Sequence, residues 1–307
     1  MNYADRLQAA LDAKGNACLI GLDPHLDLLP DDFEQARDPA CPRSVRADAL
    51  GEFCCQVIDV IADRVPAVKP QSAFFEVFGA DGVRAWERVV AHARSAGLLV
   101  IGDVKRGDIS STAAAYATGL LDPAAVGSAH VCDAVTLNPF LGADSVGPFL
   151  DACRHFGAGI YVLVRTSNPG SADFQRHGEP ELSHLVARRV REWGADLMGE
   201  CGLSSVGAVV GATHGSELRG FRKAMPETPF LLPGYGAQGA GASELVDAFL
   251  PNAGSDSPRG AIVNSSRGIT FAWRKPENAD VDWRTATSRA VDAMIAELGT
   301  ALEATPS

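Results

Sequence analysis

The residues best suited to chemistry lie in one short segment, Asp103-Val104-Lys105-Arg106-Gly107-Asp108-Ile109. Asp103 and Lys105 are two residues apart, so on an extended strand their side chains face the same side. Asp108 follows three residues later, after a glycine that permits a turn. A lysine between carboxylates stays protonated, because nearby negative charge favours the ammonium form. The segment therefore predicts a fixed proton donor beside carboxylates, one of which can lie against a substrate anion.

Two further charged residues, Asp23 and Lys69, follow apolar runs elsewhere in the chain. A lone aspartate at such a position more often caps a helix or forms a loop ion pair, and a lone lysine is usually solvated. The functional interpretation therefore depends on convergence. Alternating acidic and basic groups that meet in one place are not required by packing.

A second pair of segments predicts phosphate binding. The glycine-rich run 233–241 contains Gly234 and Gln238, and Arg267 lies in the run 264–268. Glycines expose backbone N–H groups, and the glutamine and arginine add side-chain donors for an anion. A glycine-rich loop alone is more often a plain turn, so the prediction depends on the neighbouring arginine.

The elements that must position these residues are eight short apolar runs separated by helical patterns. Most of the runs are continuous rather than alternating, which is typical of strands buried on both faces of a parallel sheet. The polar residues stand where the strands end, and in a TIM barrel those ends meet at the active site. The expected strands are Ala17–Leu22, Ala67–Lys69, Leu98–Asp103, Ala134–Asn138, Gly159–Arg165, Val206–Gly211, Phe230–Pro233 and Gly260–Asn264.

This alternation predicts an α/β protein, a (β/α)8 TIM barrel forming a single domain over residues 1–307. We expect an N-terminal helix at 2–14, the barrel at about 17–270 and a C-terminal helix at about 284–302. An open doubly wound sheet would also alternate, but no G-x-G-x-x-G follows the first strand.

Two segments are longer than ordinary loops and follow barrel strands, residues 24–43 and 166–180. They are candidate lids on the catalytic face, and the insertion at 171–180 has no assigned role. Asn138 ends the fourth strand without an assigned contact.

Composition limits which partners, cellular location and metals we expect for this protein. The net charge of −11 would repel a nucleic-acid backbone. The sequence has no run of eighteen apolar residues, so we expect no membrane span. No secretory signal is apparent, and seven cysteines without a C-x-x-C pair favour a reducing cytoplasm. The seven histidines show no paired ligand spacing, so we expect no bound metal.

At these positions the sequence resembles the orotidine 5′-phosphate decarboxylase family, in its longer-chain bacterial branch. The signature D-x-K-x-x-D-I is present as Asp103 to Ile109. Val68-Lys69-Pro70-Gln71 and the run Ser111-Thr112-Ala113 also match, and the resemblance covers nearly the whole chain.

The resemblance implies decarboxylation of orotidine 5′-monophosphate to uridine 5′-monophosphate without metal or organic cofactor. Lys105 would protonate the pyrimidine carbon after carbon dioxide leaves, and Asp103 would lie against the substrate carboxylate. Lys69 and Asp108 would complete an Asp–Lys–Asp–Lys array, with Asp108 reaching the active site of the other subunit of a homodimer.

The resemblance also implies the substrate contacts. Asp23 and Lys69 would contact ribose hydroxyls, Thr112 would do so across the dimer interface, and Ser167 would read the pyrimidine edge. The full set expected to bind substrate is Asp23, Ile109, Thr112, Ser167, Gly234, Gln238 and Arg267.

Three alternatives remain open at this stage. A sibling on the same barrel, a sugar-phosphate decarboxylase or hexulose-phosphate synthase, would use the carboxylates with magnesium. A Schiff-base aldolase would need a lysine of depressed pKa, which flanking carboxylates oppose. A catalytically silent nucleotide-binding protein would not need Asp103, Lys105 and Asp108 together.

Overall fold

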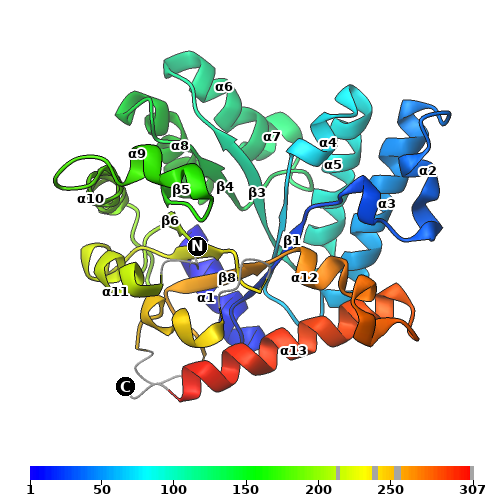
Figure 1. Ribbon diagram of the computed structural model, residues 1–307. Coiled ribbons are helices and arrows are strands. Elements are labelled where there is room, and N and C mark those ends of the chain that lie inside the picture. Colours follow the sequence, from blue (N-terminus) through cyan, green and yellow to red (C-terminus); the bar gives the residue numbers. More distant parts are fainter. Residues whose placement is uncertain (212–214, 237–240, 252–256, 305–307) are drawn as a thin grey trace.

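The computed structural model describes residues 1–211, 215–236, 241–251 and 257–304. Eight parallel strands pair in chain order and β8 pairs with β1, so the sheet closes into a barrel surrounded by helices (Figure 1). The predicted TIM barrel is confirmed and the open sheet is excluded. The strands are β1 (Cys18–Leu22), β2 (Ala67–Pro70), β3 (Leu99–Arg106), β4 (Ala134–Leu137), β5 (Gly159–Arg165), β6 (Val206–Val210), β7 (Phe230–Pro233) and β8 (Ala261–Ser265).

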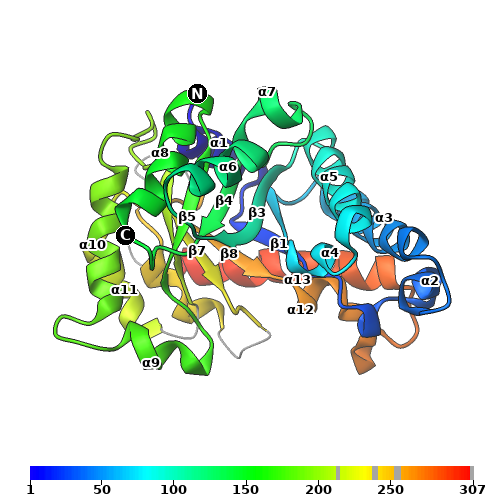
Figure 2. The same cartoon turned by 90° about the horizontal axis from the view of Figure 1, so that it is seen from above.

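The helices cover the outside of the barrel. Figures 1 and 2 show α2 and α3 on the opposite side of the barrel from α10 and α11. The helices are α1 (Tyr3–Lys14), α2 (Glu34–Arg37), α3 (Arg43–Ile61), α4 (Ala73–Glu76), α5 (Gly79–Ser95), α6 (Ser110–Leu121), α7 (Pro123–Val126), α8 (Ala143–Phe156), α9 (Ala172–Gln175), α10 (Leu182–Gly194), α11 (Gly215–Ala224), α12 (Arg267–Thr270) and α13 (Trp283–Glu303).

The apolar residues form two cores, one inside the barrel and one between the strands and the helices. Alternate residues of each strand belong to different cores, as Leu19 and Ile20 of β1 illustrate, because successive side chains of a strand point to opposite faces. Tyr3, Leu7 and Leu11 of α1 join the inner core. Helix α1 therefore closes the amino-terminal end of the barrel, and the open mouth lies at the carboxyl ends of the strands.

Both long segments are folded. Residues 24–43 contain the 3₁₀ helices η1 (Leu26–Leu28) and η2 (Asp31–Phe33) followed by α2. Residues 166–180 contain η3 (Pro169–Ser171) and α9. Within the described part of the chain, no helix is both long and apolar enough to cross a membrane.

Candidate active site

The pairing of β3 with β4 is irregular at the segment that carries the chemistry. Gly102 pairs with Val135, and regular pairing resumes only at Arg106 opposite Leu137. Three residues of β3 therefore face the single residue Thr136 of β4. Within this bulge Lys105 has a φ of 42°, which is unfavourable for a side chain with a Cβ. The bulge takes Lys105 off the regular strand path at the mouth of the barrel.

The carboxylate of Asp103 is the centre of the site and accepts four hydrogen bonds. Lys69 Nζ lies 2.7 Å from Oδ2, and Lys105 Nζ lies 2.5 Å from Oδ1. Gln71 Nε2 donates to Oδ2 at 3.0 Å, and Thr136 Oγ1 donates to Oδ1 at 2.8 Å. The structure thus brings together side chains from β2, β3 and β4. We call Lys69, Asp103 and Lys105 the aspartate–lysine cluster.

The cluster holds both buried partners in their charged forms. Burial by itself would raise the pKa of Asp103, but the charges of Lys69 and Lys105 outweigh it and hold that pKa well below its usual range. Burial would lower the pKa of Lys69, but the charges of Asp103 and Asp23 outweigh it and raise that pKa. The site therefore contains a carboxylate that stays ionised and an ammonium that stays protonated at neutral pH.

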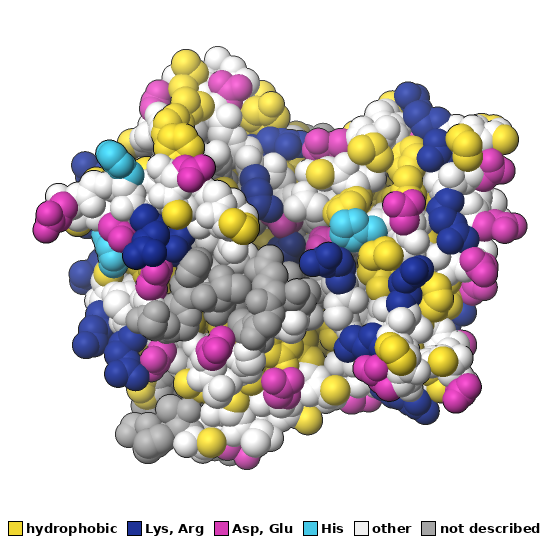
Figure 3. Space-filling model, in the orientation of Figure 1, with side chains coloured by type: hydrophobic (Ala, Val, Ile, Leu, Met, Phe, Trp, Pro, Cys, Tyr) yellow, Lys and Arg dark blue, Asp and Glu magenta, His cyan; other side chains and the backbone are white. Residues whose placement is uncertain are grey.

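The two lysines of the cluster differ in exposure. The Lys69 side chain is 5% exposed, whereas that of Lys105 is 45% exposed. Lys69 is enclosed beside Asp103, and Lys105 faces the mouth. In the space-filling view, basic and acidic side chains lie together around a hollow near the middle of the face shown (Figure 3). Lys105 is the ammonium that a bound molecule can reach.

Unpaired polar atoms lie next to the cluster, where β8 meets β1. Asp23 Oδ1, Asn264 Oδ1 and Ser266 Oγ are buried and have no hydrogen-bond partner among the described residues. The backbone at Gly21 approaches two of these residues closely, because a Cβ there would lie 2.8 Å from Ser266 Cβ and 3.1 Å from Asn264 Oδ1. A side chain at position 21 would fill this space. The region can therefore offer hydrogen bonds to a polar ligand.

Asp108, Ile109 and Thr112 lie beyond the bulge and do not join the cluster. Asp108 Oδ1 accepts a hydrogen bond from the N–H of Ile109 at 2.8 Å. Among the described residues, the ion pairs of Lys69 and Lys105 are made with Asp103 and not with Asp108. Ile109 is 51% exposed, and Thr112 is exposed on the first turn of α6. Within one chain, the array of four charges is thus incomplete.

The expected phosphate-binding residues lie after β7 and β8. Gly234 has a φ of 103° and Gly236 a φ of 73°, values that glycine adopts readily. Arg267 is exposed at the first position of α12, and Ser266 precedes it. Gln238, the other expected donor, lies outside the described residues.

The segment after β5, which carries Ser167, is held by contacts not anticipated from the sequence. Arg165 is buried, and its Nε donates to Glu217 of α11 at 2.9 Å while a terminal nitrogen donates to Ser171 at 2.7 Å. Gln175 accepts a hydrogen bond from the N–H of Thr166 at 2.8 Å. The candidate lid is thereby fastened to the barrel at both η3 and α9.

Sequence reasoning missed Gln71 and Thr136 as members of the site. Gln71 comes two residues after Lys69, and Thr136 comes two residues after Ala134 of the inner core. The period of two along a strand was the available signal in both cases. Asn138, left without a contact, accepts a hydrogen bond from Phe140 N and donates its own N–H to the carbonyl of Arg106. It shapes the turn after β4.

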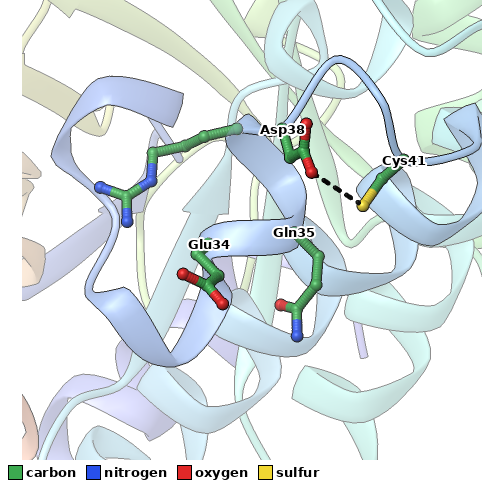
Figure 4. Close-up of a pocket in the computed structure, with 5 residues that line it drawn as sticks. Glu34, Gln35, Asp38 and Cys41 are labelled. Atoms are coloured by element: carbon green, nitrogen blue, oxygen red, sulfur yellow. Dashed lines mark hydrogen bonds between the residues drawn. The ribbon is translucent and has the colours of Figure 1, made fainter.

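A separate hollow is lined by Glu34, Gln35, Arg37, Asp38 and Cys41, on and after α2 (Figure 4). Cys41 Sγ lies 3.6 Å from Asp38 Oδ2, and none of these residues belongs to the aspartate–lysine cluster. Across the described ranges, no group of three or more His, Cys, Asp or Glu side chains has the arrangement of a metal site. The cluster is the arrangement with the clearest chemistry.

A closed barrel with charged side chains gathered at the carboxyl ends of its strands is the architecture of a TIM-barrel enzyme. The chain belongs to the family described as orotidine 5′-phosphate decarboxylase / HUMPS, whose sequence model matches residues 5–280.

The relatives cover the chain almost from end to end. It is 41% identical to an orotidine 5′-phosphate decarboxylase of Rhodopirellula baltica, over 97% of this chain and 99% of that one. It is 37% identical to one of Clostridium novyi, over 96% and 98% of the two chains. The structure of Leishmania donovani OMP decarboxylase matches with a TM-score of 0.74 and 31% identity, covering 99% of this chain and all of that one.

Proposed function

We propose that the aspartate–lysine cluster carries out the chemistry of this family. The protein is a carboxy-lyase that converts orotidine 5′-monophosphate to uridine 5′-monophosphate and carbon dioxide, a step of pyrimidine biosynthesis. One observation carries the proposal for the site: an ionised, buried Asp103 lies 2.5 Å from the exposed ammonium of Lys105 at the barrel mouth.

Lys105 is the proton donor in this proposal. Loss of carbon dioxide leaves a carbanion on the pyrimidine ring, and no covalent group delocalises its charge. A fixed positive charge in a site with little water stabilises that negative charge as it develops. The Lys105 ammonium then gives its proton to the ring carbon. Its exposure on the mouth side, with Asp103 behind it, supports this role.

Asp103 lies against the carboxylate of the substrate. Because its pKa is held low, it stays ionised when a second carboxylate is brought near. Repulsion between the two anions favours departure of carbon dioxide, since the repulsion ends when the leaving group is neutral. Lys69 keeps Asp103 ionised and contacts the ribose together with Asp23. The unpaired Oδ1 of Asp23 supports a polar contact there.

The remote phosphate is bound by the segments after β7 and β8. Gly234 leaves backbone N–H groups accessible, and Gln238 and Arg267 supply side-chain donors. Binding energy from this group closes the loops over the ring and removes water from the mouth. Ser167 reads the pyrimidine edge from the segment after β5, and Ile109 lines the mouth after Asp108.

The enzyme is proposed to act as a homodimer in which Asp108 and Thr112 of each subunit complete the site of the other. Asp108 lies apart from the cluster of its own chain. Large apolar side chains are exposed nearby, on and beside α6 and before α8. Such a surface is expected to be covered by a partner. The exposed residues are Ile109, Tyr116, Phe140 and Leu141.

A reducing cytoplasm is the proposed location. All seven cysteines are free thiols. Five of them are buried with pKa values raised by burial: Cys18, Cys54, Cys55, Cys132 and Cys153. Buried thiols of this kind are unreactive hydrophobic side chains.

The experiment is to follow the absorbance of orotidine 5′-monophosphate with the purified protein, with and without EDTA. We expect the substrate absorbance to fall at the same rate in both reactions. A protein that does not consume this substrate would refute the proposed function. Turnover of this substrate that EDTA abolishes would show that a metal takes part, which would contradict the proposed metal-free chemistry.

A further inference from the structure

The β3–β4 bulge leaves one backbone group in need of a partner. Lys105 lies between the regular pairs Gly102–Val135 and Arg106–Leu137, so its N–H falls outside the regular pairing with β4. It donates to the side-chain oxygen of Thr136 at 3.0 Å. Thr136 is 2% exposed, so solvent has little access to replace this bond. A buried amide without a partner is costly, and the threonine hydroxyl prevents that cost.

The same hydroxyl also binds Asp103. A hydroxyl has one proton to donate and lone pairs that accept. Because the backbone N–H of Lys105 can only donate, and because ionised Asp103 can only accept, the direction of both bonds is fixed. Thr136 Oγ1 accepts from Lys105 N and donates its proton to Asp103 Oδ1 at 2.8 Å. A single oxygen therefore links the main chain of one cluster residue to the carboxylate of another.

These two bonds hold the backbone conformation of Lys105 and the orientation of the Asp103 carboxylate. Lys105 holds a positive φ that costs on the order of 1 kcal/mol or more for a residue with a Cβ, so surrounding contacts must maintain it. The bond to Asp103 Oδ1 fixes the rotation of the carboxylate, which places Lys105 on Oδ1 and Lys69 on Oδ2. Without it, the carboxylate could rotate and change the position of the Lys105 ammonium.

We propose that Thr136 is a positioning residue for the decarboxylation. It holds the Lys105 backbone in its bulged conformation and orients Asp103, so that ammonium and carboxylate keep their places while the substrate binds and reacts. This inference rests on the proposed roles of Asp103 and Lys105. Thr136 itself does not need to touch the substrate.

The test compares Thr136→Val, which removes the hydroxyl at nearly constant shape, with Thr136→Ser, which retains it. A lost buried hydrogen bond to a charged group corresponds to about a 10- to 100-fold change. We expect kcat of Thr136→Val to fall by that factor, while KM and the Kd of the product uridine 5′-monophosphate change by less than about threefold. Thr136→Ser should recover most of the lost kcat.

Thr287 provides the matched control. It is fully buried in α13, and its hydroxyl has no hydrogen-bond partner among the described residues. Thr287→Val makes the same chemical change without touching the cluster, so kcat should stay at the wild-type value. If Thr136→Val is too unstable to purify, Thr136→Cys, whose thiol is a weaker donor and acceptor, should give a kcat between those of the valine and serine variants.

Three results would overturn the inference: wild-type kcat in Thr136→Val, a serine variant no better than valine, or a cysteine variant as active as serine. A Lys105→Ala control separates this failure from a failure of the proposed chemistry. If Lys105→Ala is inactive while Thr136→Val is fully active, only the role of Thr136 is wrong. If Lys105→Ala is fully active, the proposed roles of the cluster are wrong as well.

Discussion

The two ends of the barrel each bury an aspartate between two cations. At the mouth, Asp103 is bound by Lys69 and Lys105. At the closed end, Asp133 is bound by Arg6 of α1 at 3.1 Å and by Arg94 of α5 at 3.0 Å, and it accepts the N–H of Val100 at 2.9 Å. The two carboxylates are almost equally buried. A buried carboxylate with two cationic partners is therefore not by itself a sign of function.

The two sites differ in the backbone that carries the cationic partners and in the direction in which those partners point. Asp133 joins α1, α5 and β3 on regular backbone, beside the packed pair Tyr3 and Tyr161. Asp103 is bound by a lysine on strained backbone, with its ammonium facing an open mouth. Strain kept in place by neighbouring contacts is typical of active sites. We therefore assign a structural role to the closed end and the proposed chemistry to the mouth.

The largest effect is expected from removing the two charges separately. Asp103→Asn should lower kcat by about 10²- to 10³-fold, because a preorganised charge at the reaction centre is lost. Asp133→Asn should leave kcat within about threefold of wild type and lower the free energy of unfolding by about 1–3 kcal/mol. Steady-state kinetics and urea unfolding of both variants measure this contrast. A kcat loss of equal size in both variants would remove the distinction between the two ends.

A smaller effect is expected in the pH dependence of stability. In the folded protein the pKa of Asp103 is lowered, so its contribution is complete above about pH 4 and is lost as pH falls further. The pKa of Lys69 is raised, so its contribution is complete below about pH 10 and is lost as pH rises further. The cluster therefore adds no slope at neutral pH in the wild type.

In Asp103→Asn the balance at Lys69 changes. Burial without the carboxylate should lower the pKa of Lys69, and the unfolded state then binds more protons than the folded state. Stability should therefore rise with pH across the neutral range, by up to about 1.4 kcal/mol per pH unit. Urea unfolding of wild type and variant from pH 6 to pH 9 (about three pH units) measures the two slopes. Parallel slopes would show that Asp103 does not control Lys69.

Much of the fold follows from local patterns. The eight apolar runs predicted the eight strands, and most ends differ by one residue or none, because burial on both faces leaves little polar sequence within a parallel strand. The third strand was the exception. It was expected to end at Asp103, where polar residues begin, but it continues to Arg106 through the bulge.

The site was predictable in outline only. Spacing suggested that Asp103 and Lys105 face the same side, and their side chains do meet. The assumption that both residues lie on a regular extended strand was wrong, because Lys105 lies in a bulge and has a positive φ. For Thr136 the period of two after Ala134 was the only signal, and the residue type added none, since a threonine in a strand has an ordinary structural interpretation. The ion pair between Arg165 and Glu217 joins residues 52 positions apart, which no local pattern reveals.

The measurement that tests the central claim most directly is turnover of orotidine 5′-monophosphate by Lys105→Ala, with the Kd of uridine 5′-monophosphate measured on the same preparation. If Lys105 supplies both the stabilising charge and the proton, kcat should fall by at least about 10⁴-fold. The Kd of the product should change by only a few fold. A variant that binds the product normally and retains more than a tenth of the wild-type kcat would contradict the account.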